Sequence, residues 1–230
     1  MRSETAEKIL NENRESYDQM AVEFSATRAK FWEELAFLAE HATPGMHVLD
    51  IGCGNGRFYS LLEARNVTYT GLDNSAGLLK EARRLHPGVN FVEGDATACS
   101  FPDESFDIAF SFATIHHVPS RALRTKFITE AARILRPGGT LILTAWDLWQ
   151  PAHFMKLMLS ANPFSVYELG DIILTFGKKK HKRYLHAFTE KELCKLLKKN
   201  GFEIVGSDII VRESGSGQKN FLVVAKRKNS

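Results

Sequence analysis

A glycine-rich turn that directly follows a short apolar stretch most limits what this chain can fold into. Residues 47–51 are predicted to form a buried strand, and the turn from Asp50 to Gly56 has glycines at positions 52, 54 and 56. Glycine permits tight turns and lets the backbone approach a ligand without a Cβ clash. In an open α/β sheet, a turn at the carboxyl end of a strand is a ligand-binding position. The pattern alone is weak, because structural turns and dinucleotide loops share it.

Strands and helices alternate around this turn. Such alternation predicts an α/β fold of the doubly wound, Rossmann-like type, with a parallel sheet and helices on both of its faces. Strands are expected at 47–51, 68–72, 89–92, 106–112 and 140–146, and helices at 57–65, 75–85 and 120–135.

The two ends of the chain add helices and a final hairpin. Two helices, at 5–23 and 28–41, are expected before the break at Thr43-Pro44-Gly45. Thr189 and Glu192 have the spacing of a capping box, which predicts a helix to about residue 200.

Two last strands, at 202–210 and 220–225, are expected to pair across a turn at 214–217. Residues 147–186 show only helical potential near 152–159 and are otherwise hard to interpret. We therefore expect a single domain over residues 1–230, made of an N-terminal helical lid (1–43), a cofactor-binding core (44–146), a substrate-side insertion (147–188) and a C-terminal helix with a hairpin (189–230).

Carboxylates follow the first three predicted strands. Asp50 ends the first strand, Asp73 ends the second about 20 residues after the turn, and Asp95 follows the third. A carboxylate at the second position can accept hydrogen bonds from both ribose hydroxyls of a nucleotide, and Asp95 can meet an adenine amino group. Alone, Asp73 is also typical of a helix cap and Asp95 of a turn. Three such carboxylates together predict a cofactor site.

Cysteine usage and hydropathy argue against several classes of protein. Cys53, Cys99 and Cys194 are odd in number and far apart, so neither a zinc site nor a disulfide framework is expected. No apolar run approaches the ~20 residues that cross a bilayer. The N-terminus is polar and lacks a signal-peptide core. We expect a cytoplasmic protein with no metal and no membrane segment.

Charge is divided unevenly along the chain. Residues 1–177 carry a balance of −6, whereas residues 178–230 carry +9. The run 178–183 and the tail 226–228 are the basic clusters. Such asymmetry is typical of a polyanion-binding end, although a solvated basic surface is an equal interpretation.

Several motifs of the chain resemble the class I S-adenosylmethionine-dependent methyltransferases. These are VLDIGCGNG, GLDNS, EGDA, FPDESFDIAFS and ILRPGGTLILT. The resemblance implies a seven-stranded sheet whose last strand is antiparallel, with S-adenosyl-L-methionine as cofactor and S-adenosyl-L-homocysteine as product. The cofactor set that it implies has Asp50, Gly52, Cys53 (through its backbone), Gly54 and Gly56 at the methionine part, Asp73 and Asn74 at the ribose, Asp95 and Ala96 at the adenine, and Tyr17 and Ser111 beside them.

A second resemblance, to the tRNA wobble-uridine methyltransferases, lies outside the cofactor motifs. It covers Ser16-Tyr17-Asp18, 24–28, His116-His117, Ala145-Trp146, 183–188 and 220–227. Those enzymes esterify the carboxylate of 5-carboxymethyluridine, and the eukaryotic members work with a small zinc-binding activator subunit. The resemblance implies tRNA as a partner, bound through 178–183 and 226–228, and an activator as a further partner.

The acceptor chemistry suggests two catalytic residues. A carboxylate is ionised at neutral pH, so it needs alignment and a fixed cation more than a base. Arg28 can bind a carboxylate with two hydrogen bonds, and an exposed arginine is its alternative interpretation. His116 is expected to donate a hydrogen bond or act as a base, unless it is a buried histidine that fixes the loop. His117 is expected to support the loop.

Two other functions compete with tRNA methylation. One is a small-molecule O-, N- or C-methyltransferase acting on a quinone precursor or an organic acid, which would be insensitive to RNA. The other is a non-catalytic subunit that binds the cofactor without turnover.

Overall fold

Seven strands form one mixed sheet in the computed structural model, which describes residues 1–160, 165–177, 179–212 and 217–229. The central strands are parallel, whereas β9 is antiparallel to both of its neighbours. In spatial order the strands are β3 (Asn90–Glu93), β2 (Thr68–Asp73), β1 (His47–Ile51), β4 (Phe106–Phe112), β5 (Leu135–Trp146), β9 (Lys219–Arg227) and β8 (Phe202–Val211). The predicted doubly wound fold and the antiparallel last strand are confirmed.

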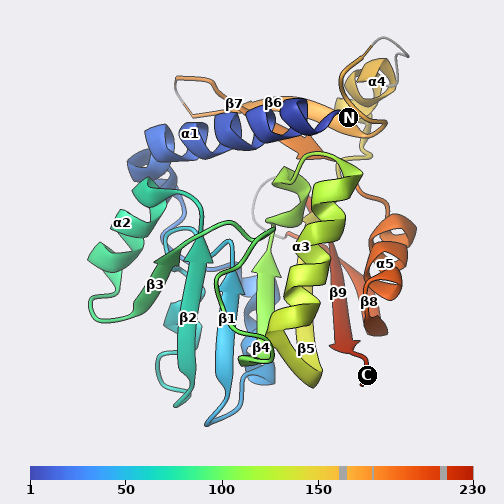
Figure 1. Cartoon of the computed structure of the whole chain (residues 1–230). Coiled ribbons are helices and arrows are strands. Elements are labelled where there is room, and N and C mark those ends of the chain that lie inside the picture. Colours follow the sequence, from blue (N-terminus) through green and yellow to red (C-terminus); the bar gives the residue numbers. More distant parts are fainter. Residues whose placement is uncertain (161–164, 178, 213–216, 230) are drawn as a thin grey trace.

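Helices cover both faces of this sheet (Figure 1). One core lies between the sheet and the helices α3 (Arg121–Ile134) and α5 (Glu190–Lys199). The other lies against η1 (Glu33–His41) and α2 (Ala76–Leu85). Side-chain caps begin three of the helices, because Ser75, Ser120 and Thr189 accept backbone hydrogen bonds at the starts of α2, α3 and α5.

The segment after the glycine turn corrects one prediction. Instead of a helix over 57–65, it contains only the short η2 (Tyr59–Leu61). The backbone there closes mostly bonds three residues apart, as in a 3-10 helix. Phe58 and Leu62 are both buried in the core. Tertiary packing of these two side chains therefore outweighs the helical pattern.

An N-terminal helix and a small hairpin lie above the carboxyl ends of the central strands (Figure 1). The helix, α1 (Ser3–Thr27), is longer than predicted. The hairpin consists of β6 (Asp171–Phe176) and β7 (His181–His186) and was not anticipated from the sequence. It follows α4 (Pro151–Ser160), which matches the helical potential near 152–159. No helix among the described residues is both long and apolar enough to span a membrane.

One buried amide fastens α1 to the hairpin. The Asn13 side chain accepts from the Tyr184 backbone N–H at 2.7 Å and donates to the Tyr184 carbonyl at 3.1 Å. The side-chain amide thereby bonds to both backbone groups of Tyr184, as the backbone of a neighbouring strand would. It also donates to the carbonyl of His117. Asn13 thus holds α1, β7 and the loop after β4 in one arrangement above the sheet.

A buried polar cluster anchors the hairpin from its other side. Asp171 accepts hydrogen bonds from the Tyr184 hydroxyl at 2.6 Å and from His186 at 2.8 Å. His186 also contacts Glu192 of α5. Burial alone would lower the pKa of His186, but its bonds to these two carboxylates raise it. The hairpin is therefore tied to the body of the protein through its own polar side chains.

Candidate functional site

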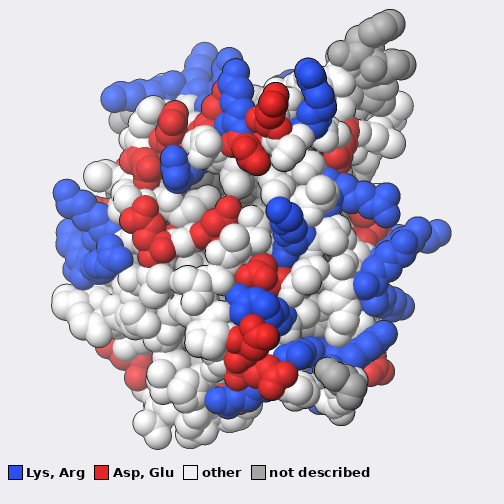
Figure 2. All heavy atoms as spheres, viewed as in Figure 1, with Lys and Arg blue, Asp and Glu red and all other residues white. Residues whose placement is uncertain are grey.

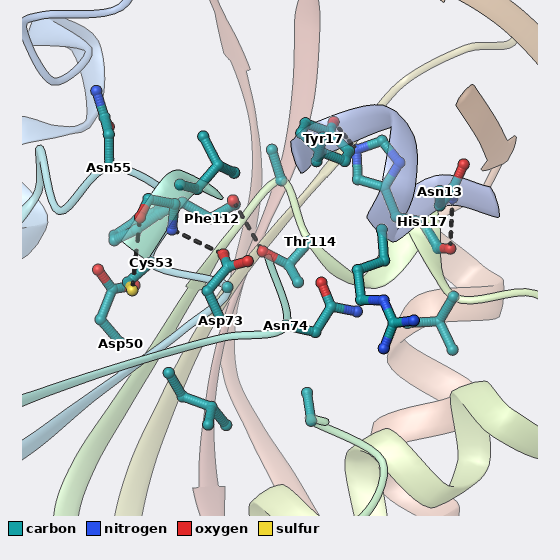
Figure 3. Close-up of a pocket in the computed structure, with 18 of the residues that line it drawn as sticks. Asn13, Tyr17, Asp50, Cys53, Asn55, Asp73, Asn74, Phe112, Thr114 and His117 are labelled. Atoms are coloured by element: carbon teal, nitrogen blue, oxygen red, sulfur yellow. Dashed lines mark hydrogen bonds between the residues drawn. The ribbon is translucent and has the colours of Figure 1, made fainter. Parts of the chain in front are cut away.

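A cavity lies at the carboxyl ends of β1, β2 and β4, beneath α1 and the hairpin (Figure 3). It encloses about 1180 Å³ of empty space, including its open mouth. The strand order reverses between β1 and β4, which is where open α/β sheets bind ligands. The residues predicted to bind a cofactor that line this cavity are Tyr17, Asp50, Gly52, Cys53, Gly54, Asp73, Asn74, Asp95 and Ala96.

The glycine turn forms the floor at one end of the cavity. Gly52 has a φ of 75° and Gly54 a φ of 58°, in the left-handed region that favours glycine. The backbone N–H groups of Gly52 and Cys53 both donate to the Leu72 carbonyl, at 2.7 and 3.0 Å. The Gly54 N–H donates to Asp73 Oδ2 at 2.8 Å. The turn is thus fixed against β2.

Gly56 is not among the residues that line the cavity, and its predicted role at the cofactor stays a prediction. A Cβ at this position would lie 2.7 Å from the Phe91 ring, a side chain on β3. The third glycine is therefore required for packing between the turn and the sheet.

Replacing Gly52 with alanine is expected to lower the free energy of unfolding by about 3 kcal/mol, because left-handed strain and overpacking add. A Cβ at Gly52 would lie 2.2 Å from Thr114 Oγ1. Gly54→Ala is the matched control, because its nearest neighbour would be 3.9 Å away and only strain of about 1–2 kcal/mol applies. Urea denaturation measures both losses. Equal losses would contradict the proposed clash.

Three carboxylates make this end of the cavity acidic. Asp50 is buried and accepts from the Tyr69 hydroxyl at 2.9 Å. Burial raises the pKa of Asp50 to about 7, and the Tyr69 hydrogen bond opposes this shift. Asp73 accepts from the Ser75 N–H at 2.9 Å, and burial raises its pKa. Asp95 accepts from the Thr97 N–H at 2.7 Å. The arrangement suits a ligand that carries positive charge and hydroxyl groups.

Binding of a positively charged ligand at this end is expected to strengthen as the pH rises from 6 to 8. A pKa of about 7 leaves Asp50 mostly protonated at pH 6 and mostly ionised at pH 8. A ligand that requires the ionised form would bind up to about tenfold more weakly at pH 6. Calorimetry with S-adenosylmethionine measures this, and Asp50→Asn should flatten the profile. An equally steep profile in the variant would assign the titration to another group.

Two of the arginines that line the cavity, Arg28 and Arg183, lie among aromatic rings, and this part is its basic end. Arg28 lies 4.6 Å from the Phe24 ring centre and 4.4 Å from that of Phe176. Arg183 lies 4.8 Å from the Phe176 ring centre and 5.7 Å from that of Trp146. Burial and the nearby charge of Arg183 lower the pKa of Arg28. This end is therefore suited to an anionic ligand with a planar part.

The two adjacent histidines exchange their predicted places. His116 is fully buried and is not among the residues lining the cavity; its Nδ1 accepts from the Trp146 N–H at 3.2 Å. His117 lines the cavity. Its Nδ1 bonds to the Tyr184 carbonyl, so this nitrogen is the donor, and the Tyr17 hydroxyl donates to its Nε2 at 2.8 Å (Figure 3). Burial lowers the pKa of His117 to about 3. The cavity therefore contains a neutral histidine, and it is His117.

Ser111 does not line the cavity either. It lies on β4 two residues after Ala109, and alternate residues of a strand share a face. Ala109 packs in the core beneath α3, so the buried Ser111 side chain points to that side of the sheet. The structure therefore does not bring Ser111 together with the other predicted cofactor residues, and its contact with a cofactor stays a prediction.

The basic run 178–183 separates into two environments. Lys179, Lys180 and Lys182 are exposed at or next to the turn of the hairpin, while Lys178 is outside the described residues. Figure 2 shows Lys and Arg side chains gathered along the upper rim of the molecule, over the hairpin and α1. Arg183, by contrast, is buried and lines the cavity. The sequence interpretation missed this role, which the alternation of side chains along β7 would have revealed had the hairpin been recognised.

The basic tail 226–228 lies at the opposite edge of the sheet from the cavity. In the antiparallel pair of β5 and β9, Trp146 faces Asn220 at the cavity end, whereas Thr140 faces Lys226 at the far end. Figure 1 shows the C-terminus at this far edge. The tail therefore lies apart from the basic hairpin, and its contact with RNA stays a prediction.

Comparison with known proteins finds a matching family model and several similar proteins. Residues 49–143 match the model of a methyltransferase domain. A protein of Encephalitozoon cuniculi whose name assigns it to the methyltransferases is 34% identical, over 82% of this chain and 86% of its own. The tRNA (carboxymethyluridine(34)-5-O)-methyltransferase of Saccharomyces cerevisiae is 31% identical, over 64% of this chain and 52% of its own. The fatty-acid O-methyltransferase of Mycolicibacterium smegmatis is 40% identical, over 46% and 39%.

Solved structures share the fold. A S-adenosylmethionine-dependent methyltransferase of Methanosarcina mazei superposes with a TM-score of 0.73 at 27% identity, over 87% of this chain and all of the other. A Haloferax volcanii protein, solved in complex with the Trm112 methyltransferase activator, gives a TM-score of 0.70 at 18% identity, over 95% and 98%.

Proposed function

Because the chain belongs to the S-adenosylmethionine-dependent methyltransferases, we propose that it methylates the carboxylate of a carboxymethyl group on the wobble uridine of a tRNA. The observation that carries this proposal is that one cavity is lined both by three carboxylates at the glycine turn and by two arginines among aromatic rings. The acidic end suits a cationic methyl donor, and the basic end suits an anionic, planar acceptor. The name of the Saccharomyces cerevisiae relative supports this choice of acceptor.

The acidic end fits S-adenosylmethionine. Gly52 and Gly54 line the cavity without a side chain, and the buried Asp50 carboxylate is part of the same lining. We assign Asp50 and the turn to the methionine part, Asp73 with Asn74 to the ribose, and Asp95 with Ala96 to the adenine. When bound, the cofactor supplies a methyl group activated on a sulfonium.

The residues at the basic end would orient and desolvate the acceptor. Arg28 can hold the carboxylate by two hydrogen bonds and so compensate for its loss of water. A carboxylate with an ordinary pKa of about 4 is ionised at pH 7 and needs no general base. The absence of a need for a base agrees with the state of His117, because its low pKa leaves the imidazole neutral. Alignment of a bound nucleophile can contribute up to about 7–11 kcal/mol.

The exposed lysines of the hairpin are the proposed contact with tRNA. Lys179, Lys180 and Lys182 are exposed, belong to the same hairpin as Arg183, which lines the cavity, and carry positive charge that phosphates attract. A small activator subunit and a cytoplasmic location belong to the same proposal, through the resemblance to the eukaryotic wobble-uridine enzymes.

Transfer of labelled methyl from S-adenosylmethionine to total tRNA tests this function. The tRNA should come from a strain that lacks its own wobble methylation, and the assay should be run with and without a candidate activator. An alkali-labile label on the wobble uridine is the expected result. tRNA without the carboxymethyl group is the control and should remain unlabelled. Absence of label from RNA under both conditions would overturn the proposal.

A fatty acid or other organic acid is the second candidate acceptor. The similarity to the Mycolicibacterium smegmatis enzyme favours it, because that protein's name also implies esterification of a carboxylate. Methylation of free acids that is unaffected by salt would favour this candidate, since phosphate contacts make RNA binding strongly dependent on salt.

A further inference from the structure

Arg183 is a buried cation in the cavity with no acidic partner in the part of the chain that the structure describes. Only 5% of its surface is exposed. Its Nε is buried and donates to none of the described groups, and one Nη donates to the Tyr17 hydroxyl at a long 3.4 Å. Burying a guanidinium without a counter-charge is costly. The site is therefore incomplete without an anion.

The groups around Arg183 keep this cation in place without neutralising it. The rings of Trp146 and Phe176 contact it, and aromatic faces attract cations. Tyr17 donates its own proton to His117, which leaves the Tyr17 oxygen as the acceptor for Arg183. Arg28 approaches the same Phe176 ring, so two positive charges converge where neither has a carboxylate in the described residues.

We propose that Arg183 is a specificity-determining residue, which together with Arg28 makes the acceptor site bind a carboxylate and release its methyl ester. This rests on the proposed function for the identity of the acceptor but not for the binding of an anion. Arg183 lies on β7 of the hairpin, and Arg28 is the residue that follows α1. The two covering elements of the cavity therefore meet around the acceptor's negative charge.

The change in charge during the reaction explains why the methyl ester would be released. One carboxylate oxygen forms a bond to the methyl carbon while the carbon–sulfur bond breaks, and that bond's electron pair passes to sulfur. No proton moves. The acceptor loses its negative charge and the sulfonium its positive charge, so the ester leaves both guanidiniums without a counter-ion. Since hydrogen bonds to charged groups are the stronger ones, the product should bind more weakly than the substrate.

The test compares binding of 5-carboxymethyluridine nucleoside and of its methyl ester to protein saturated with S-adenosylhomocysteine. The wild type should prefer the acid at least about tenfold, as expected for charge-assisted hydrogen bonds. Arg183→Met should reduce this preference to less than about threefold, while Arg183→Lys should keep part of it. Affinity for S-adenosylhomocysteine should stay unchanged in both variants, which verifies their fold. Arg84→Met, at an exposed arginine on α2, is the matched control and should behave as the wild type.

A second probe separates this inference from the choice of acceptor. Phenylacetate carries the same carboxylate group, and its methyl ester carries the same ester group, but neither has a nucleoside. If only phenylacetate binds, with an acid preference that depends on Arg183, the anion site stands and the wobble-uridine function fails. An acid preference that is unchanged in Arg183→Met, or no carboxylate binding by either probe, would overturn the role of Arg183.

Discussion

Asp73→Ala is expected to weaken S-adenosylmethionine binding at least about 100-fold, since each lost hydrogen bond to a charged group costs roughly 1.5–3 kcal/mol. One carboxylate oxygen accepts from the Gly54 N–H at 2.8 Å, and the other accepts from the Ser75 N–H at 2.9 Å. Asp73 therefore fixes both the glycine turn and the start of α2. The proposed bonds to the ribose would be lost in addition. Isothermal titration calorimetry measures the affinity.

Two further variants separate ligand binding from stability. Asp73→Asn keeps an acceptor oxygen for one backbone N–H, so its loss of affinity should be smaller than that of alanine. Asp107→Asn is the matched control, because Asp107 also accepts from a backbone N–H, that of His47 at 2.8 Å, but lies at the other edge of the sheet. Its cofactor affinity should be unchanged. Unaltered affinity in Asp73→Ala would remove Asp73 from the cofactor site.

Arg28→Ala should lower kcat/KM for the carboxylate acceptor about 100- to 1000-fold, as expected for loss of a bidentate charged contact in a desolvated site. Cofactor affinity should change less than about twofold, since no ion pair joins the Arg28 side chain to Asp50, Asp73 or Asp95 among the described residues. Phe24 and Phe176 would lose a cation from their faces, but no ion pair among the described residues would be broken. Steady-state kinetics and calorimetry measure the two effects separately.

Lys30→Ala provides the control for the Arg28 variant. Lys30 is an exposed cation two residues further along the chain, and its removal should leave kcat/KM for a nucleoside acceptor within about twofold, as is usual for surface charges. Near wild-type turnover in Arg28→Ala would show that Arg28 does not hold the carboxylate. An equal loss of cofactor affinity would instead place Arg28 at the methyl donor.

The predictions that held concern local backbone chemistry and periodicity. The glycine turn, Asp73 and Asp95 were placed correctly at the cavity because each directly follows a strand whose apolar run is visible in the sequence. Parallel strands bring their carboxyl ends to one edge, so residues far apart in sequence become neighbours by topology alone. The hairpin of β8 and β9 followed from two apolar runs with a turn between them.

The predicted site residues that the structure places outside the cavity lining differ from the others in the direction in which the residue points. His116 and His117 are adjacent in the short η3 helix (Ile115–His117), and only His117 is turned toward the cavity. Gly56 and Ser111 were assigned to the cofactor by motif, yet packing against Phe91 and beneath α3 accounts for them. Such choices depend on which surfaces are covered by elements distant in the chain.

The amino-acid sequence by itself determined the doubly wound sheet, the glycine turn and the acidic end of the cavity, because these depend on hydrophobic periodicity and on backbone conformations that few residues adopt. Only the tertiary structure decided the composition of the basic end. Arg183 reaches it because β6 and β7 pair above the sheet, and Asn13 fixes β7 against α1. Asn13 and Tyr184 of β7 are 171 positions apart, and no local pattern encodes their contact.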